Sequence, residues 1–385
     1  MRNKPRIRFK GFTEDWEQRK LGSILIEYTE KNPGNENLPV LTSSRQGLTK
    51  QEDHFGSVQR HDISDYNVIP LGFCTYRNRS DDKTFTFNIN RIVPRGLVSK
   101  FYPVFEIKNG NADFITEYLN NNIEIIKLLA VNAVGTSQVV LSLRALRNIE
   151  VTFPLKAEQV VIGNFIRKLD IYITLHQRKL EKLKLAKKAL LQKLFPKNGS
   201  QFPEIRFKGF TDAWEQRKFK DIAFKRGKIS EADLPYVEFE DINSGIGTLN
   251  KNILQKVGHK KGILFEAGDV LFGKLRPYLQ NWLLCQFMGI AVGDFWVFQP
   301  QIVSSAFLYY LIQSEAYQSV ANISSGTKMP RSSWSLVSET RFSIPKYKEA
   351  TMIGEFLTSI DKNITLHQQE PFLCGNSVNG GVKLC

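Results

Sequence analysis

The feature that most constrains this chain is an internal duplication. Residues 5–20 read PRIRFKGFTEDWEQRK and residues 203–218 read PEIRFKGFTDAWEQRK, so thirteen of sixteen positions are identical. A second pair of segments, residues 163–177 and 354–368, shares eight of fifteen positions and ends in the same run, ITLHQ. The first pair is offset by 198 residues and the second by 191. Chance does not produce matches in this order, so the chain is predicted to contain two copies of one scaffold.

The segments between the repeated words have diverged. Residues 25–145 and 223–335 share few words, yet both alternate short β-type runs with turn residues. We expect strands at 85–87, 89–93, 97–104, 263–265, 270–272 and 295–298, and helices over 114–130 and 305–320. Each copy is therefore predicted to be a mixed α/β (α+β) globule with a curved, mainly antiparallel sheet. Constant ends around a variable middle indicate one scaffold with two specificities.

A long helix is predicted to follow the first globule. From Glu158 onward, apolar residues recur at alternating spacings of three and four, which is typical of a heptad seam. The seam consists of Ile166, Leu169, Ile173, His176, Leu180, Leu183, Lys187, Leu190 and Leu194. Pro154 precedes it and Pro196 follows it, so the helix should run for about 35 residues, or roughly 50 Å.

A helix of that length needs a partner along its seam. The natural partner is the matching helix of the second copy, packed antiparallel as a coiled coil, with seam residues Leu357, Ile360, Ile364 and His367. His176 and His367 occupy equivalent positions and are interpreted as interface residues, not as metal ligands. The outer face of the first helix carries eight basic residues between His176 and Lys197 against one acid, Glu181. Such a face is usually just solvated; its functional alternative is a spacer that lies over DNA or holds partner subunits.

The two copies differ after Gln368. The first helix continues RKLEKLKLAKKALL, whereas the second copy reads QEPFLCGNSVNGGVKLC, with Pro371 and three glycines. Since proline and glycine disfavour helix, we expect the second helix to stop after residue 368 and an unrelated tail to follow. The expected division is a globule over 1–154, a helix over 155–197, a globule over 198–344 and a shortened helix over 345–385.

Composition narrows the class of partner. The chain has 385 residues and a net charge of +15, a surplus that attracts polyanions such as nucleic acid, although a basic protein without such a partner is the alternative. No window approaches eighteen apolar residues and no signal peptide is recognised, so we expect a cytoplasmic location and no membrane partner. The four cysteines are scattered, which predicts neither a zinc site nor a disulfide framework.

A short echo lies near the end of each globule. Residues 133–143 read AVGTSQVVLSL and residues 324–336 read SSGTKMPRSSWSL, so Gly-Thr follows a helical segment in both, and a polar loop then runs toward an expected apolar strand. Glycine there permits positive φ and a close backbone approach. An ordinary turn explains the echo equally well. The side chains with donors suited to phosphates or base edges are Thr136, Ser137, Gln138, Thr327 and Lys328.

No catalytic or cofactor motif is found. Residues 268–275 read GDVLFGKL, which satisfies part of a P-loop but places Leu275 where a serine or threonine must bind magnesium. Asp269 to Phe272 reads instead as a strand. There is no dinucleotide-binding turn, nucleophile elbow, metalloprotease motif or amino-methyltransferase tetrad. The chain is predicted to be non-enzymatic and without a cofactor or metal; an NTP-using enzyme with a divergent P-loop remains an alternative.

In its organisation the sequence resembles the specificity subunit of type I restriction-modification enzymes, its staphylococcal-like members in particular. The resemblance rests on F-K-G-F-T-x-x-W-E-Q-R-K opening each copy, G-D-V-L-F-G-K-L-R-P-Y-L at 268–279, the Gly-Thr echo and the helix ending in I-T-L-H-Q. It covers residues 1 to about 368. It implies two target-recognition domains that each read one half of a split site in double-stranded DNA. It also implies helices that space the halves and dock two methyltransferase subunits, with restriction subunits joining later.

The resemblance also suggests contact residues. The family's K-L-R-P-Y word falls on Lys274, Arg276 and Tyr278, whose charges suit phosphate contact or guanine reading. At the corresponding place the first copy reads C-T-Y-R-N-R, which makes Tyr76, Arg77 and Arg79 looser candidates. The competing interpretation is that these arginines only pair with nearby acids. The loops at 43–46 and 240–244, which are polar and lie between expected strands, are further candidates for base contact.

Two other functions stay open at this point. One is a regulator outside restriction that reads a split operator. The other is an inactive specificity subunit from a rearranged gene, which the altered tail after Gln368 raises.

Overall fold

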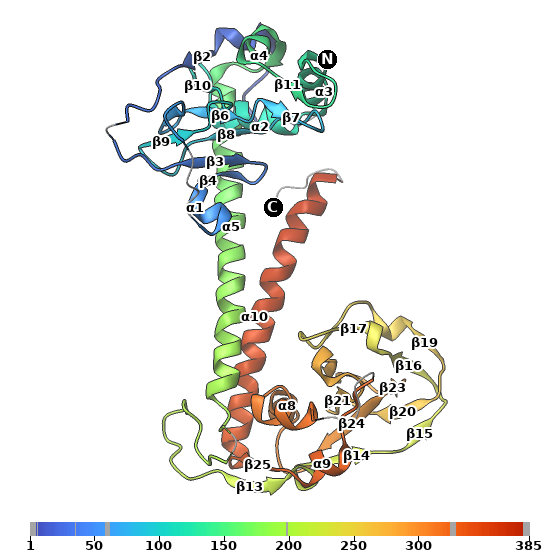
Figure 1. Cartoon of the computed structure of the whole chain (residues 1–385). Helices are drawn as coiled ribbons and strands as arrows, with labels where there is room; N and C mark the ends of the chain where they lie inside the picture. Colours follow the sequence, from blue (N-terminus) through green and yellow to red (C-terminus); the bar gives the residue numbers. More distant parts are fainter. Residues whose placement is uncertain are drawn as a thin grey trace. The chain divides into compact units, whose positions relative to one another are not determined.

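The computed structural model describes residues 5, 7–34, 36–57, 62–197, 199–323 and 329–379, and for 369–379 only the backbone helix. The chain divides into two compact units, Met1–Thr174 (unit 1) and Leu175–Cys385 (unit 2). Helix α5 (Lys156–Lys193) begins in unit 1 and ends in unit 2. Figure 1 shows the elements of each unit.

Unit 1 is built around a four-stranded antiparallel sheet with the order β2–β10–β6–β8. A separate antiparallel pair, β1–β12, joins the first repeated word to the strand before α5. The strands of unit 1 are β1 (Glu17–Lys20), β2 (Leu25–Tyr28), β3 (Leu41–Ser44), β4 (Gly47–Lys50), β5 (Asn67–Pro70), β6 (Cys74–Tyr76), β7 (Arg79–Ser80), β8 (Phe87–Ile89), β9 (Arg95–Val98), β10 (Val104–Ile107), β11 (Val139–Val140) and β12 (Glu150–Phe153). Its short helices are η1 (Leu21–Ser23), α1 (Gln51–Phe55), α2 (Ala112–Asn121), α3 (Ile123–Asn132) and α4 (Leu143–Asn148).

Unit 2 repeats this plan. Its four-stranded antiparallel sheet has the order β14–β24–β21–β22, and β13 pairs with β25 as β1 pairs with β12. These strands are β13 (Glu215–Lys218), β14 (Ala223–Arg226), β21 (Val270–Gly273), β22 (Trp282–Leu284), β24 (Phe295–Pro300) and β25 (Arg341–Ile344). Its helices of four residues or more are α6 (Phe219–Ile222), α7 (Ser305–Leu311), α8 (Glu315–Ala321), α9 (Trp334–Glu339) and α10 (Tyr347–Asn379). The predicted pair of mixed α/β globules with mainly antiparallel sheets is confirmed.

The middles of the two units differ, as the diverged sequences predict. Unit 2 has a five-stranded sheet, β15–β20–β23–β16–β19, in which β16 and β23 are parallel. Its strands are β15 (Ile229–Ser230), β16 (Asp233–Val237), β19 (Val257–His259), β20 (Gly262–Phe265) and β23 (Gly289–Ala291). Unit 1 instead has the hairpin β3–β4 and the pair β5–β9.

The opening repeated word contacts the long helix that closes the copy, α5 in unit 1 and α10 in unit 2. Arg8 donates two hydrogen bonds, both 2.6 Å, to the buried carboxylate of Glu158. Phe9, next to Arg8, packs edge-on against Phe165 of α5 with ring centroids 5.5 Å apart. The opening word of unit 1 is thereby fastened to the start of its closing helix.

Unit 2 forms the same contacts with the equivalent residues. Phe207 packs against Phe356 at 5.6 Å, and Arg206 pairs with Glu349. The constant words are therefore the scaffold of each unit.

A glycine in each closing helix allows a close approach to an earlier helix of the same unit, α2 in unit 1 and α7 in unit 2. A Cβ on Gly163 would lie 2.1 Å from Oδ1 of Asn111, the residue that caps α2. A Cβ on Gly354 would lie 2.8 Å from the backbone nitrogen of Phe307 in α7. No side chain fits at either place, which explains why both copies of this word begin with glycine.

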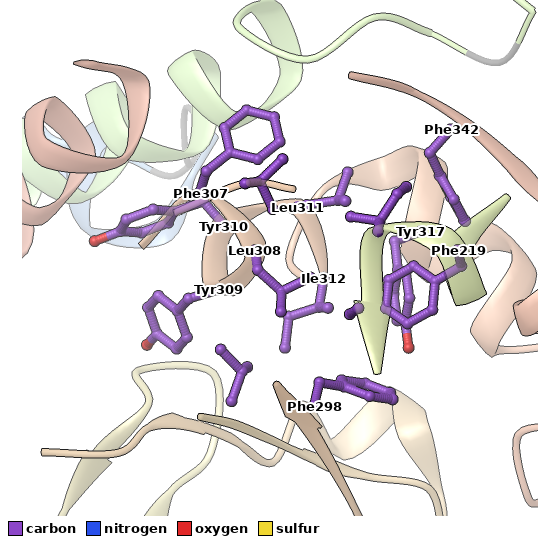
Figure 2. Packing of buried hydrophobic residues seen from close by; sticks show 14 of the residues in the cluster. Phe219, Phe298, Phe307, Leu308, Tyr309, Tyr310, Leu311, Ile312, Tyr317 and Phe342 are labelled. Carbon is purple, nitrogen blue, oxygen red and sulfur yellow. The ribbon is translucent and has the colours of Figure 1, made fainter. Parts of the chain in front are cut away.

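Aromatic residues fill the core of unit 2. The rings of Phe219, Tyr317 and Phe342 form a mutual cluster, with centroids 5.1 Å apart for Phe219 and Tyr317 and 5.8 Å for the other two pairs (Figure 2). Phe219 directly follows the opening word of unit 2, and Phe342 lies on β25 next to the closing helix. This core therefore joins the two constant ends of the copy.

Several predicted elements are wrong in detail. The helix expected over 114–130 is two helices, because Asn122 between them has an extended backbone and its side chain caps α3. The helix over 305–320 is likewise α7 and α8, separated at Ser314, which caps α8. The strand expected over 97–104 is β9 and β10 with a turn between them, and 89–93 is mostly a loop held by Asn90. The strand expected after the second Gly-Thr is helix α9.

The predicted long helix is present as α5, with 38 residues. Within unit 2, its second half runs antiparallel to α10, since His176 meets His367 while Lys187, farther along α5, meets the earlier residue Asp361 (Figure 1). The predicted stop after Gln368 is wrong, because α10 continues to Asn379. Proline removes one backbone hydrogen bond and costs about 3 kcal/mol, which weakens a helix at Pro371 without ending it. Residues 380–385 lie outside the described part of the chain.

Candidate nucleic-acid interface

Unit 1 has a polar cleft beside its central sheet. The cleft has a volume of about 470 Å³. Its lining comes from the tip of the β3–β4 hairpin, from α1, and from the turns around β7; it includes Ser43, Ser44, Arg45, His54, Phe55, Arg77, Arg79, Asp82, Thr84 and Tyr102. Two segments that the sequence suggested separately, the loop at 43–46 and the word after β6, thus meet in one place.

One wall of this cleft is fastened by Asp82. Its carboxylate accepts hydrogen bonds from the hydroxyls of Ser80 at 2.8 Å and Thr84 at 2.6 Å, and it forms an ion pair with Arg45. Hydrogen bonds from Thr84, Ser80 and Arg45 hold the pKa of Asp82 well below its usual range. Arg45 also donates to the hydroxyl of Thr84 at 2.9 Å. The hairpin tip is therefore tied to the turn that follows β7.

The C-T-Y-R-N-R word places its three candidates differently. Tyr76 is completely buried and donates a hydrogen bond to the carbonyl oxygen of Leu141, so its prediction as a DNA contact is wrong. It belongs to β6, the third strand in the order of the sheet, and its ring packs on Phe87. Arg77 and Arg79 are exposed and line the cleft. Arg79 stacks on Phe101, with Cζ 4.1 Å from the ring centroid.

The first Gly-Thr echo lies next to Arg79. Strand β11, which follows the loop, pairs with β7, Val140 being opposite Arg79. Thr136, Ser137 and Gln138 are exposed, and Gln138 donates to Asp81 at 3.0 Å. The loop is therefore positioned at the same edge as the cleft arginines.

Unit 2 brings together the equivalent two words. After β21, Leu275 forms a β-bridge with Arg331, and the backbone nitrogen of Ser332 donates to the carbonyl oxygen of Lys274 at 2.9 Å. The backbone nitrogen of Arg276 donates to the carbonyl oxygen of Pro330 at 2.7 Å. Thr327 and Lys328, which come just before this segment in the sequence, lie outside the described residues.

The loop after β21 has an unusual backbone. Arg276 and Gln280 both adopt positive φ, 49° and 58°, on either side of a turn that contains Pro277. Tyr278 is more than half exposed, whereas Arg276 is half-buried, and its Nε has no hydrogen-bond partner among the described residues. Left-handed backbone at two residues other than glycine costs energy and commonly marks functional loops.

Cations gather beside this loop. Asp294 accepts from Arg331 at 3.0 Å and lies 3.5 Å from the amine of Lys274. Lys225 of β14 lies over the ring of Trp334 at 4.5 Å. Burial, followed by the positive charge of Lys274, lowers the pKa of Lys225. Lys274 and Arg331 thus share one carboxylate, and Lys225 adds a third positive charge beside Lys274. A bound phosphate would relieve the repulsion among these cations.

The residues at these two candidate places that sequence reasoning missed are Phe101, Asp82, Asp294, Arg331 and Lys225. Arg331 stands inside the second Gly-Thr echo, so that word held a signal for it. No sequence signal marks Phe101 or Lys225, because their partners, Arg79 and Trp334, are distant in the sequence and are brought close only by folding.

The helix residues of unit 2 form a packed seam. The Nδ1 atoms of His176 and His367 are 3.2 Å apart. Lys187 pairs with Asp361 at 2.7 Å, and Asp361 accepts from the hydroxyl of Tyr310 at 2.8 Å. The seam residues Leu357, Ile360, Ile364, Leu180, Leu183 and Leu190 are buried or partly buried, whereas Leu169 and Ile173 in unit 1 are more than a third exposed and Ile166 is half-buried.

In the part of the chain that the structure describes, no helix combines the length and apolar character needed to cross a bilayer.

Comparison with known proteins identifies the family. A model of the type I restriction modification DNA specificity domain matches residues 13–185 and again residues 211–372. The chain is 22% identical over 306 residues to the specificity subunit of the type I restriction enzyme MjaVIII of Methanocaldococcus jannaschii, covering 72% of this chain and 70% of that one. Its fold is similar to the type I restriction-modification S subunit from M. genitalium, with a TM-score of 0.54 and 12% identity over 92% of both chains. The two family matches coincide with the two copies, and the chain belongs to the type I restriction-modification specificity subunits, which recognise DNA sequence and are themselves non-catalytic.

Proposed function

We propose that the chain reads a split site in double-stranded DNA, one half with each unit, for a methyltransferase and a restriction subunit that carry out the chemistry. The observation that carries the proposal is a shared arrangement of different residues. In both units the segment after Gly-Thr lies beside the residues that follow the same strand of the sheet, β6 in unit 1 and β21 in unit 2. A duplicated frame with unlike side chains at one equivalent place suits two readers of different sequences.

The charge of these places supports a DNA ligand. Unit 1 offers Arg77 and Arg79, and unit 2 offers Lys225, Lys274 and Arg331. Lysine and arginine bind phosphates, while polar and arginine side chains read base edges. Thr136, Ser137, Gln138, Arg276 and Tyr278 are proposed as neighbouring contacts, together with Thr327 and Lys328 from sequence alone.

The helix pair is proposed as the docking surface for two methyltransferase subunits. In unit 2 its surface includes exposed leucines, Leu175, Leu185 and Leu366, and the basic residues Arg178 and Lys179. Exposed apolar side chains rimmed by charge are typical of protein interfaces. The restriction subunits would join the complex that this docking forms, and no cofactor is assigned to this chain.

The test is to express the full chain with an adenine methyltransferase subunit of a type I system and map methylated adenines across the genome. We expect one split motif. Arg276→Ala with Tyr278→Ala should change only one half of it, and Arg77→Ala with Arg79→Ala only the other. A continuous motif, or a variant of one unit that alters both halves, contradicts the proposal. A regulator of a split operator would give binding without any methylated motif.

A further inference from the structure

We propose that Arg79 is the side chain of unit 1 that reads a base, and that the base is a guanine in the major groove. This inference rests on the proposed function and deepens it. The basis is that Arg79 is the cleft arginine whose guanidinium is both oriented and uncommitted.

The orientation of Arg79 is fixed from two sides. Its backbone belongs to β7, which is paired with β11. Its guanidinium lies over the ring of Phe101 at 4.1 Å, and Lys100 also lies 5.8 Å from that ring. Stacking holds the plane of a guanidinium and leaves the donors at its edge available, so less side-chain entropy is lost when it binds.

Each of the other two arginines of the cleft lacks one of the two properties of Arg79: Arg45 lacks free donors and Arg77 lacks a ring beneath it. Arg45 is already engaged by Asp82 and Thr84, so its donors serve the hairpin. Arg77 and Arg79 form no ion pair within the described residues, and Arg77 has no aromatic ring beneath it there. The nearest acids to Arg79 in sequence are occupied, since Asp81 accepts from Gln138 and Asp82 from Ser80 and Thr84. Arg79 is therefore held over the ring of Phe101 and has its guanidinium donors available for a ligand.

The chemistry of the fork selects guanine. Two parallel N–H groups of arginine match the O6 and N7 acceptors that guanine presents in the major groove. Adenine places an amino donor where O6 would be, so one of the two hydrogen bonds becomes a repulsion. Arg77, which carries the charge without the stacking, suits a phosphate, whose recognition tolerates rotation.

The experiment uses the full chain in complex with its methyltransferase subunit. The motif is first mapped by methylation in cells. Duplexes that differ from the motif by one base pair are then competed for the purified complex, with wild type, Arg79→Ala, Arg79→Lys, Phe101→Leu and Arg77→Ala. Co-purification and thermal unfolding establish that each variant is folded and assembled.

For the wild type we expect one G·C pair in the half read by unit 1 whose replacement lowers affinity roughly 10- to 100-fold. Arg79→Ala should reduce that penalty to about twofold or less at this position and leave the other positions unchanged. Arg79→Lys keeps the charge but loses the fork, so it should lower the penalty while retaining most of the affinity. Phe101→Leu should weaken discrimination at the same position by a smaller factor.

Arg77→Ala is the matched control. It should weaken binding to all duplexes alike and reduce the slope of log affinity against log salt by about 0.9, as expected when one phosphate is no longer neutralised. The inference is overturned if Arg79→Ala retains the wild-type penalty at every position, if the half-site has no such G·C pair, or if both alanine variants give the same profile. Absence of any split motif with wild type would instead reject the proposed function.

Discussion

Arg206 donates two hydrogen bonds to Glu349, from Nε to Oε1 at 2.6 Å and from Nη2 to Oε2 at 2.8 Å. The carboxylate is 1% exposed and the guanidinium side chain 15% exposed. Arg206 belongs to the opening word of unit 2 and Glu349 to its closing helix, so this fork joins the constant ends of the copy. The hydrogen bond to Glu349 is the main cause that raises the pKa of Arg206, which stays charged at any accessible pH.

Arg206→Ala should destabilise unit 2 by about 3–5 kcal/mol, because it leaves the Glu349 carboxylate buried without its cation. Unfolding in urea, followed by tryptophan fluorescence, measures this, since four of the five tryptophans, Trp214, Trp282, Trp296 and Trp334, lie in unit 2. The paired replacement Arg206→Met with Glu349→Leu should recover most of the loss, because it removes both charges together.

The control for this fork is the exposed pair of Arg217 and Glu215, in which both side chains are more than half exposed. Arg217→Ala should cost less than about 1 kcal/mol. Equal losses in Arg206→Ala and Arg217→Ala would show that burial of Glu349 has no energetic importance.

Gly354→Ala should destabilise unit 2 although alanine is the better helix former. On an open helix face the change stabilises by about 0.5–1 kcal/mol. Here the new methyl would lie 2.8 Å from Cβ of Ala306 and from the nitrogen of Phe307, and overpacking of this kind costs about 1–3 kcal/mol. A lower midpoint in urea is the expected result. Glu355→Ala, on the exposed neighbouring position, should leave the midpoint nearly unchanged.

Unit 2 should lose stability in alkali. Burial raises the pKa of Tyr309, Tyr310 and Tyr317, and the charge of Asp361 raises that of Tyr310 further. The folded state therefore holds these phenolic protons more tightly than the unfolded state, whose tyrosines titrate near pH 10. The contribution is complete below about pH 10 and falls above it, by at most about 1.4 kcal/mol per pH unit for each tyrosine.

Urea midpoints between pH 8 and pH 11 test this sign. Above pH 10, Tyr310→Phe should reduce the slope of the unfolding free energy against pH by the contribution of one titrating group. Tyr278→Phe, at an exposed loop position, is the control and should leave that slope unchanged. A midpoint that rises above pH 10 would contradict the expected direction.

The charge balance around Asp294 should tune DNA affinity. Lys274→Ala and Arg331→Ala should each weaken binding and reduce the salt slope by about 0.9 for each phosphate that is no longer neutralised. Asp294→Asn should strengthen binding severalfold at low salt, because it removes the carboxylate that these two cations share. Electrophoretic mobility or anisotropy measurements at several salt concentrations give both quantities. Lys220→Ala serves as a control, since Lys220 is a surface cation that pairs with Glu339 and not with Asp294.

Much of the frame was predictable from sequence because duplication reveals it directly. The repeated words located the closing helices and the opening segment of each copy, which contains β1 in unit 1 and β13 in unit 2, and β21 and β24 lie where β-type runs were expected. The breaks at Asn122 and Ser314 were harder to predict, because each residue interrupts a helical pattern by capping a second helix. A short polar side chain can lie inside a helix or cap one, and tertiary packing decides between the two. Pro371 led to the opposite error, a predicted helix end where helix α10 continues.

The contact residues were less predictable for a physical reason. Tyr76 and Arg79 are three residues apart and equally suited to bind DNA by composition, yet one is the ring of a buried strand and the other an exposed cation. The alternation of buried and exposed side chains along a strand does not distinguish them, because β6 ends at Tyr76, inside the C-T-Y-R-N-R word. The roles of Phe101 and Asp294 depend on loop geometry, which a single sequence does not contain.

The contacts that fasten each copy, Arg8 with Glu158 and Arg206 with Glu349, use equivalent residues on equivalent elements. For inheritance this has a consequence: the opening words, which agree at thirteen of sixteen residues, offer related genes matching places for crossover. Under the proposed function, a crossover there would deliver an entire reader whose Arg–Glu fork is already matched, and with it a new DNA target in one event. Point mutation would have to rebuild such a surface residue by residue.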